Sequence, residues 1–248
     1  MGTYYNLLLA WSLLCLAACF FLFFRTAPYG RYLRKGWGIE VSSRLGWILF
    51  ESPPVYLMIV FFFLYSNQSF VQILFVSIWM IHYLNRSFVW PLKAKISGKP
   101  MPLIVIFLAL VFNAINVYLQ GSWIFLFGEY STSWLTSKPF VVGFLLFFIG
   151  MYINITSDNI LIGLRKDSDE DYSVPKGFLF NKVSSPNYLG EMIEWLGWAI
   201  MTWSLAGLVF FFWTVANLLP RAIANHKWYK KKFPDYPSDR KAIIPYLL

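Results

Sequence analysis

Five stretches of this sequence are each as long as a membrane-crossing helix and almost free of charge. They cover residues 4–24, 46–65, 69–90, 102–120 and 139–163. A helix needs roughly 20 consecutive apolar residues to cross about 30 Å of hydrocarbon, so each stretch predicts a transmembrane helix. The composition agrees, because 58% of the 248 residues are hydrophobic and 21% are aromatic, which is outside the range of a soluble domain of this length. The predicted fold class is an all-α polytopic membrane protein.

The last apolar stretch, residues 187–219, would reach about 50 Å as one straight helix, which is too long for one span and short for two. Charge decides, because Lys and Arg collect on the cytoplasmic side of short loops. With an outside N-terminus and two spans here, 187–202 and 205–222, every Lys and Arg except Lys138 lies inside. We therefore predict seven transmembrane helices, a break within residues 202–207 and a cytoplasmic tail over residues 223–248. Residues 1–248 are interpreted as a single membrane-embedded domain.

Several common site types are absent from the sequence. Cys15 and Cys19 lie four residues apart in the first span, which gives neither an extramembrane disulfide framework nor a metal-ligand spacing. The first span lacks the basic n-region and the cleavage site of a signal peptide, so we expect it to stay in the protein. No GxGxxG, GxxxxGK[ST], HExxH or GxSxG motif occurs. A nucleotide would therefore have to bind in a pocket built from helix ends and cytoplasmic loops.

Glu51 interrupts the second apolar stretch. A carboxylate in hydrocarbon costs several kcal/mol unless it has a partner or a role, so Glu51 is a candidate functional residue. Ser52, Pro53 and Pro54 follow it, and Ser before Pro is typical of a helix N-cap, which predicts that the regular helix begins at Ser52. The alternative is an acid at a helix end near the interface, paired with a basic loop residue.

The third stretch ends with polar side chains on the same predicted side of the membrane as Glu51. His82, Tyr83 and Arg86 are three or four residues apart, so they can point into the helix bundle together. Tyr and Arg are also ordinary interface anchors at helix ends. The group therefore gains its weight from sharing a side with Glu51.

Polar residues recur at helical spacing near the cytoplasmic ends of two later spans. They are Asn154 and Asp158 in the fifth span, and Asn187, Glu191 and Glu194 in the sixth. Such side chains on one helix face suit a polar ligand such as a ribose or an amide, and Arg165 is placed for a phosphate. Hydrogen bonds between helices would also explain the pair in the fifth span. Two acids one turn apart in the sixth span are harder to explain as scaffold.

The tail continues this pattern into a longer motif. It reads His226-x-x-Tyr229-x-x-x-Phe233-x-x-Tyr236-Pro237-x-x-Arg240-x-x-x-Ile244-Pro245, after Asn187-x-x-Gly190-Glu191-x-x-Glu194-Trp195 and Asn154-x-x-x-Asp158. A basic amphipathic helix on the membrane surface explains its Lys and aromatic residues but not its later Tyr-Pro and Arg positions. With these motifs the chain resembles the steroid 5-alpha-reductase family over residues 29–248, and its steroid-reducing branch in particular. The tail alone is also similar to those of enoyl-CoA, polyprenol and sterol reductases and of isoprenylcysteine methyltransferases.

The resemblance implies a seven-helix reductase that uses NADPH to saturate the carbon–carbon double bond of an enone such as a 3-oxo-4-ene steroid. The positions that match Glu51 and Tyr83 hold the substrate carbonyl. The positions that match cofactor contacts are Asn154, Asp158, Arg165, Tyr172, Asn187, Glu191, Arg221, His226, Tyr229 and Arg240. Some relatives carry further His residues before the tail His, where this chain has Ala224 and Asn225. The choice between Asn225 and His226 as the cofactor contact is open.

The implied roles meet simple physical requirements. Hydride addition to the β-carbon moves negative charge onto the carbonyl oxygen, so a hydrogen-bond donor aimed at that oxygen stabilises the transition state more than the ground state. The Tyr83 hydroxyl can donate, and so can a Glu51 that burial keeps neutral. Which of the two delivers the proton is open. An apolar cavity would keep water from the enolate and admit a lipid-soluble substrate.

Two other functions fit the same residues. A small ion-coupled transporter could use Glu51, Asp158, Glu191 and Glu194 as an ion path, although the inverted repeats typical of transporters are not evident. A reductase of another lipid enone or enoyl substrate, such as polyprenol or enoyl-CoA, is the second. The expected partners are a steroid and membrane lipid, without nucleic acid or metal. We expect a monomer, with a bacterial member of the family preferred, in a bacterial inner membrane or an endoplasmic reticulum membrane.

Overall fold

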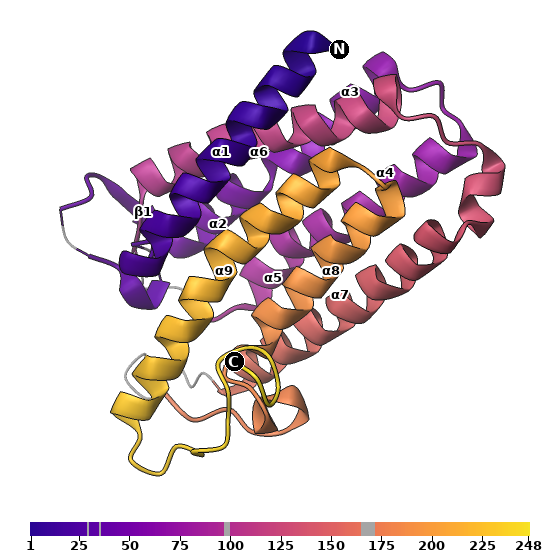
Figure 1. Ribbon diagram of the computed structural model, residues 1–248. Helices are drawn as coiled ribbons and strands as arrows, with labels where there is room; N and C mark the ends of the chain where they lie inside the picture. Colours follow the sequence, from indigo (N-terminus) through magenta and orange to yellow (C-terminus); the bar gives the residue numbers. More distant parts are fainter. Residues whose placement is uncertain (29, 35, 97–99, 165–171) are drawn as a thin grey trace. The chain divides into compact units, whose positions relative to one another are not determined.

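The computed structural model describes residues 1–28, 30–34, 36–96, 100–164 and 172–248, and most of these are helical (Figure 1). Among the elements, η1, η4 and η5 are 3-10 helices, whereas η2 and η3 are π-helices. In chain order the elements are α1 (Gly2–Phe24), η1 (Gly30–Tyr32), β1 (Glu40–Ser42), α2 (Ser43–Glu51), α3 (Pro53–Tyr65), α4 (Phe70–Leu84), η2 (Asn85–Val89), α5 (Trp90–Lys93), β2 (Pro100–Pro102), α6 (Leu103–Ser122), η3 (Trp123–Phe127), η4 (Thr132–Thr136), α7 (Lys138–Leu164), η5 (Phe178–Asn181), α8 (Pro186–Thr202) and α9 (Leu205–Lys232).

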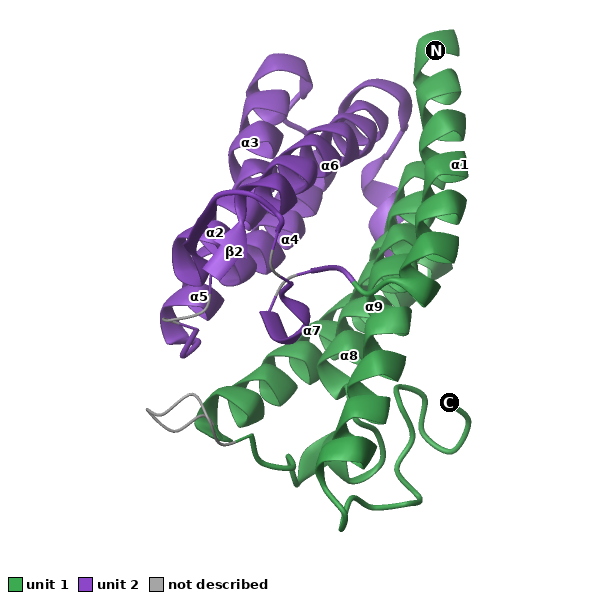
Figure 2. Ribbon diagram, turned by 90° about the vertical axis from the view of Figure 1, so that its left-hand side faces the viewer, with its two compact units in different colours: residues 1–26, 138–248 green, residues 27–137 purple. Residues whose placement is uncertain are grey.

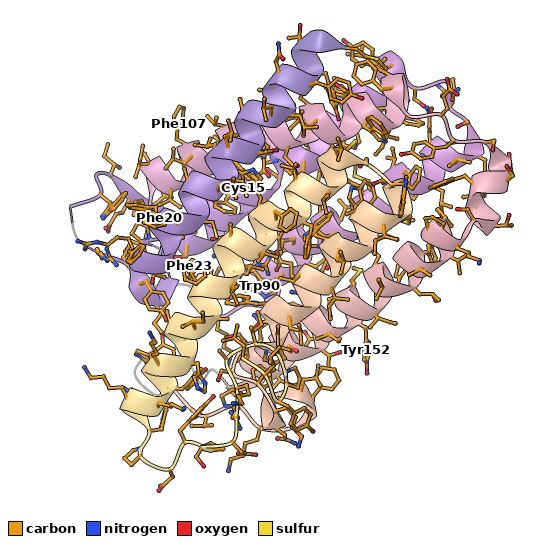
Figure 3. The ribbon with its side chains drawn as sticks, in the orientation of Figure 1. Cys15, Phe20, Phe23, Trp90, Phe107 and Tyr152 are labelled. Atoms are coloured by element: carbon orange, nitrogen blue, oxygen red, sulfur yellow. The ribbon has the colours of Figure 1, made fainter. Side chains whose placement is uncertain are left out.

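Five helical segments of the described chain are long and apolar enough to cross a membrane. They are Gly2–Phe24, Ser43–Tyr65, Leu103–Phe127, Lys138–Leu164 and Leu205–Lys232. Large apolar side chains on these helices project away from the ribbon, as Figure 3 shows for Phe20, Phe107 and Tyr152, which are 71%, 59% and 64% exposed. So much exposed apolar surface is unfavourable in water and suits lipid. The all-α membrane fold predicted from the sequence is confirmed.

The chain divides into two compact units (Figure 2). Unit 1 comprises Met1–Thr26 and Lys138–Leu248, and unit 2 comprises Ala27–Ser137. Within unit 1, α7 packs against α8, α8 against α9, and α9 against α1. Within unit 2, α6 packs against both α2 and α3, and α3 packs against α4.

Glycines allow the backbones of α7 and α8 to touch. The four glycines at this contact are Gly143 and Gly150 on α7, and Gly190 and Gly197 on α8. A Cβ atom added to Gly150 would lie 2.3 Å from the backbone nitrogen of Glu194, and one added to Gly143 would lie 2.3 Å from that of Met201. Small residues at such positions let membrane helices approach closely. Because later residues of α7 face earlier residues of α8, the two helices are antiparallel.

The last apolar stretch contains two helices. α8 ends at Thr202 and α9 begins at Leu205, inside the range 202–207 in which the sequence predicted a break. Trp203 adopts the left-handed conformation, with φ of +45°. The Ser204 side chain then accepts a hydrogen bond from the Gly207 backbone N–H at 2.9 Å and so caps the N-terminus of α9.

The helix start predicted after Glu51 is confirmed to within one residue, but a second helix that was not predicted precedes it. α3 begins at Pro53 with Ser52 in the N-cap position, but the Ser52 side chain makes no capping hydrogen bond. A further helix, α2, precedes it directly, so Glu51 is the last residue of α2 and also lies just ahead of the first turn of α3. The physical reason is an earlier cap, because the Ser42 side chain accepts from the Leu45 N–H at 3.3 Å and starts a helix before the prolines.

A two-stranded antiparallel sheet in unit 2 was not predicted. β1 pairs with β2 in the register Val41 opposite Met101. Met101 packs over Gly46 of α2, where an added Cβ would lie 2.7 Å from the Met101 sulfur. The sheet therefore ties the start of α2 to the start of α6.

Candidate functional site

In the polar site of unit 2, Pro54 leaves a backbone carbonyl without its helical hydrogen-bond donor. Because Pro54 has no backbone N–H, the carbonyl of Phe50 loses its usual helical donor. The Asn113 side-chain amide of α6 donates to that carbonyl at 2.7 Å. Asn113 is buried, at 4% exposed, so a polar side chain in a membrane helix satisfies a carbonyl that the proline left without a partner.

The carbonyl of Glu51 is satisfied in a similar way. The Val55 N–H donates to the Ser52 carbonyl at 3.0 Å, one residue closer than in a regular α-helix. The Ser87 hydroxyl of η2 donates to the Glu51 carbonyl at 2.6 Å. Side chains from α6 and η2 thus hold the backbone on both sides of the break at Ser52.

Tyr83 faces this break. Trp79, one turn before it, donates from Nε1 to the Pro54 carbonyl at 3.2 Å, and Ser87, one turn after it, bonds to the Glu51 carbonyl. Residues four apart lie on one face of a helix, so Tyr83 lies between these two contacts on the same face. Tyr83 is 3% exposed, and its ring centroid lies 4.6 Å from that of Trp79. Tyr83 in α4 and Glu51 at the end of α2 therefore both belong to the part of unit 2 where α4 and η2 bond to the backbone around the break.

Arg86 is the charged neighbour of Glu51. Its Nε atom lies 3.8 Å from Oε1 of Glu51. Its guanidinium carbon lies 5.1 Å from the ring centroid of Trp47 and 4.9 Å from that of Trp90. Arg86 belongs to the π-helix η2, where the Trp90 N–H donates to the Asn85 carbonyl. Such widened turns are frequent at functional sites.

The polar residues of α7 and α8 form a hydrogen-bonded ladder in unit 1. The Asn154 side-chain amide donates to the Asn187 carbonyl at 3.0 Å and to a Glu191 carboxylate oxygen at 3.3 Å. The Asn187 side-chain amide donates to a carboxylate oxygen of Asp158 at 3.0 Å. The close glycine contact between the two helices makes these bonds possible. The sequence predicted each residue, but it left open whether Asn154 and Asp158 bond between helices, which they do.

Arg221 lies beside this ladder in the same unit. Its Nε donates to the Tyr188 hydroxyl at 3.1 Å, and Tyr188 follows Asn187 in α8. The Tyr172 ring lies 5.0 Å from the ring of Trp228, near the end of α9. Arg165 lies outside the residues that the structure describes.

The tail folds back beside the chain segment that precedes α8. Val183 and Lys241 form a parallel bridge, and the Ser184 N–H donates to the Lys241 carbonyl at 2.8 Å. The rings of Tyr229 and Tyr236 stack with centroids 5.4 Å apart. Arg240, at 3% exposed, donates from Nη1 to the Pro175 carbonyl at 3.1 Å. The predicted residues Tyr229 and Arg240 therefore belong to one folded cluster, which also includes His226.

Sequence reasoning missed residues that the structure places at these sites. In unit 2 they are Trp47, Ser87, Trp90 and Asn113, and in unit 1 they are Ser184 and Tyr188. A signal for Ser87 and Asn113 was present, because prolines at positions 53 and 54 leave carbonyls that some polar side chain has to satisfy.

Glu194 is fully buried on α8, and its backbone lies at the close contact with Gly150.

The unit 1 residues are of the chemical types that could contact a dinucleotide. Asn154 and Asn187 offer amides, Glu191 and Asp158 offer carboxylates, and Arg221 offers a cation. Amides and carboxylates suit ribose hydroxyls and a carboxamide, and guanidinium groups suit phosphates. Among the described residues, no three His, Cys, Asp or Glu side chains are grouped so that they could hold a metal ion.

Comparisons with known proteins agree with the resemblance seen in the motifs. The family model described as 3-oxo-5-alpha-steroid 4-dehydrogenase matches residues 99–248. Steroid 5-alpha-reductase DET2 of Gossypium hirsutum is 44% identical over 234 residues, which cover 91% of this chain and 90% of the relative. The 3-oxo-5-alpha-steroid 4-dehydrogenase 1 of Rattus norvegicus is 39% identical over 232 residues, covering 90% and 86%, and that of Homo sapiens is 37% identical over 225 residues, covering 88% and 85%. This chain therefore belongs to the steroid 5-alpha-reductase family and is a membrane oxidoreductase of steroid metabolism.

Proposed function

We propose that this protein uses NADPH to reduce the C4–C5 double bond of 3-oxo-4-ene steroids, which yields 5-alpha-reduced 3-oxo steroids. The observation that carries the proposal is that Trp79 and Ser87, one turn to either side of Tyr83, donate to the backbone carbonyls of Pro54 and Glu51 at the proline break. Its relatives bear the names steroid 5-alpha-reductase DET2 and 3-oxo-5-alpha-steroid 4-dehydrogenase 1, which supports a steroid as the substrate.

In this proposal, unit 2 handles the substrate carbonyl. The Tyr83 hydroxyl and a protonated Glu51 donate to the carbonyl oxygen, on which negative charge develops during the reaction. A donor already fixed in place stabilises that charge without reorganising, and low local polarity strengthens the effect. Tyr83 is held by packing against Trp79, and the Glu51 backbone is held by Ser87. The proton for the α-carbon comes from one of the two side chains or from water.

Unit 1 would hold the cofactor. The residues are Asn154, Asp158, Tyr172, Asn187, Glu191, Arg221, His226, Tyr229 and Arg240, together with Arg165. When bound, NADPH supplies the hydride for the β-carbon. The ladder of α7 and α8 presents polar groups in a fixed order, and fixed polar groups bind with a smaller loss of side-chain freedom. We propose that the two units act as one monomeric reductase domain.

The topology that accompanies this function has seven spans, an outside N-terminus and a cytoplasmic tail. The two spans beyond the five long helices are residues 69–90, which cover α4 and η2 and reach the start of α5, and residues 187–202, which lie in α8. The positive-inside distribution supports this orientation. The membrane is a bacterial inner membrane or that of the endoplasmic reticulum. Single cysteines at Ser133 and Lys231, in a background without Cys15 and Cys19, test it: only the first should react with an impermeant thiol reagent added from outside.

A product assay tests the reaction. Detergent-purified protein is incubated with NADPH and, separately, with 3-oxo-4-ene steroids, enoyl-CoA and polyprenal, and the products are identified by mass spectrometry. We expect a gain of two hydrogens in the steroids and 5-alpha stereochemistry. Reduction of only enoyl-CoA or polyprenal would replace the substrate class. No change in NADPH absorbance with any enone would contradict the reductase assignment.

A further inference from the structure

Ser184, in the connection between η5 and α8, joins three separate parts of the tail. Its hydroxyl oxygen lies 2.6 Å from Nδ1 of His226 and 2.7 Å from the hydroxyl oxygen of Tyr236. The same oxygen lies 3.0 Å from the carbonyl oxygen of Lys241. These partners belong to α9, to the turn after it and to the C-terminal segment. One side chain, only 4% exposed, therefore fastens the tail at three points.

These three contacts use the whole hydrogen-bonding capacity of the hydroxyl group. A serine hydroxyl has one hydrogen to donate and two lone pairs that accept. The Lys241 carbonyl can only accept, so it takes the Ser184 hydrogen. Arg240 donates to the Tyr236 hydroxyl oxygen at 3.4 Å, which leaves the Tyr236 hydrogen for Ser184.

The remaining lone pair of Ser184 determines the state of His226. With its hydrogen given to Lys241, Ser184 can only accept from the imidazole, so Nδ1 of His226 carries a hydrogen. A neutral imidazole with Nδ1–H has its acceptor lone pair on Nε2. The arrangement thus fixes both the position of the ring and the nitrogen that faces away from Ser184.

We infer that Ser184 is a positioning residue that fixes the Nδ1–H tautomer of His226 and the fold of the tail around Tyr236 and Arg240. For the cofactor this inference rests on the proposed function, since His226 and Arg240 are proposed cofactor contacts. The hydroxyl of Ser184 acts through these residues and need not touch the cofactor itself.

The chain has two histidines, so the tautomer can be read directly. Protein labelled with ¹⁵N-histidine gives two imidazole signal sets by long-range ¹⁵N–¹H NMR, and a His82→Gln variant assigns them. We expect the parent to show the Nδ1–H pattern for His226 and the Ser184→Ala variant to lose it. A parent with Nε2–H, or a Ser184→Ala spectrum like that of the parent, overturns the inference.

The cofactor arm measures NADPH affinity and kinetics in the same variants. Ser184→Ala and Tyr236→Phe should each raise the Kd and the KM for NADPH at least about 10-fold, because each leaves buried polar groups without partners. The kcat at saturating NADPH should change less than threefold. Ser238→Ala, an exposed serine of the same tail, is the control and should match the parent. Tyr236→Phe keeps the ring stack and tests the network if Ser184→Ala does not fold.

The two arms separate the possible failures. If the parent does not bind NADPH, the proposed function fails while the NMR experiment still decides the role of Ser184. If the parent binds NADPH and the Ser184→Ala and Tyr236→Phe affinities equal that of the parent, the role of Ser184 in cofactor binding is wrong.

Discussion

Nε of Arg86 lies 3.8 Å from Oε1 of Glu51, and the two side chains are 12% and 14% exposed. The rings of Trp47 and Trp90 lie on the same guanidinium group, and they are themselves 4.9 Å apart between centroids. A cation on two aromatic faces is held electrostatically as well as by packing. Glu51 therefore has a charged neighbour whose position three separate elements determine.

Replacing Arg86 should impair turnover more than cofactor binding. The Arg86→Met variant removes the cation that lies 3.8 Å from the Glu51 carboxyl group, and removing one partner of a largely buried charge pair is costly. We expect kcat to fall at least about 10-fold while the NADPH Kd changes less than threefold. Arg86→Lys keeps the charge without the planar stack, and its kcat should lie between those of the parent and of Arg86→Met. Lys93→Met, an exposed cation of α5, is the control, and equal turnover in it and Arg86→Met would rule out a role for Arg86.

Conservative changes at the proposed carbonyl site should act on chemistry. Glu51→Gln and Tyr83→Phe each remove one proton-transferring or donating group, and such groups contribute about 100-fold or more. We expect kcat with a 3-oxo-4-ene steroid to fall by about that factor and the NADPH Kd to stay near that of the parent. Tyr56→Phe removes the hydroxyl of a tyrosine that is 57% exposed on α3, and it should have no effect. Unchanged turnover in Tyr83→Phe would take Tyr83 out of the reaction.

The ladder of α7 and α8 should govern cofactor affinity. Asn154→Ala removes two hydrogen bonds and leaves the Glu191 carboxylate with one donor fewer. A buried polar group that loses its partner costs about 1–3 kcal/mol, so the NADPH Kd should rise about 5- to 150-fold with little change in kcat. Fluorescence titration with NADPH measures the Kd. Asn159→Ala, at an exposed position of the same helix, is the matched control, and equal affinities in the two variants would contradict the assignment.

The glycine contact can be tested within one helix. Gly150→Ala places a methyl group 2.3 Å from a backbone nitrogen of α8, whereas a Cβ on Gly163 meets no atom within 4 Å. Overpacking against rigid backbone costs about 1–3 kcal/mol or more. We expect the thermal midpoint of Gly150→Ala in detergent to fall by roughly 4 °C or more. Gly163→Ala should be neutral or more stable, because Ala favours helices over Gly by about 1 kcal/mol. Similar midpoints in both variants would show that the backbones do not touch.

The distribution of apolar and charged residues along the sequence predicted the membrane fold well. Apolar runs of span length identify helices because hydrocarbon leaves few alternatives. Polar residues in such runs stand out for the same reason, and Glu51, Tyr83, Asn154 and Asn187 were singled out as candidate site residues in this way. The break after Thr202 followed from helix length and charge.

Other features depend on contacts between segments far apart in the sequence. Asn113 and Ser87 reach the carbonyls near Pro54 from α6 and η2, and no local pattern names which polar residue does so. The strands β1 and β2 have three residues each, too few for a periodic signal. Ser184 looked like an ordinary loop serine, because its three partners lie 42 to 57 residues away.

The glycines of α7 and α8 set the position of the two helices along one another, and so the register of the whole polar ladder. Sliding α8 along α7 by one turn, about 5.4 Å, would put side chains where the two backbones now touch. Gly143 and Gly197 lie two turns farther from the ladder than Gly150 and Gly190. They therefore help to determine which acceptor Asn154 meets. Inserting one residue between Gly190 and Gly197 would rotate one glycine by about 100° relative to the other. Glycine contacts near the opposite end of the two helices therefore help to determine which residues Asn154 and Glu191 lie beside. These contacts are distant from any bound cofactor.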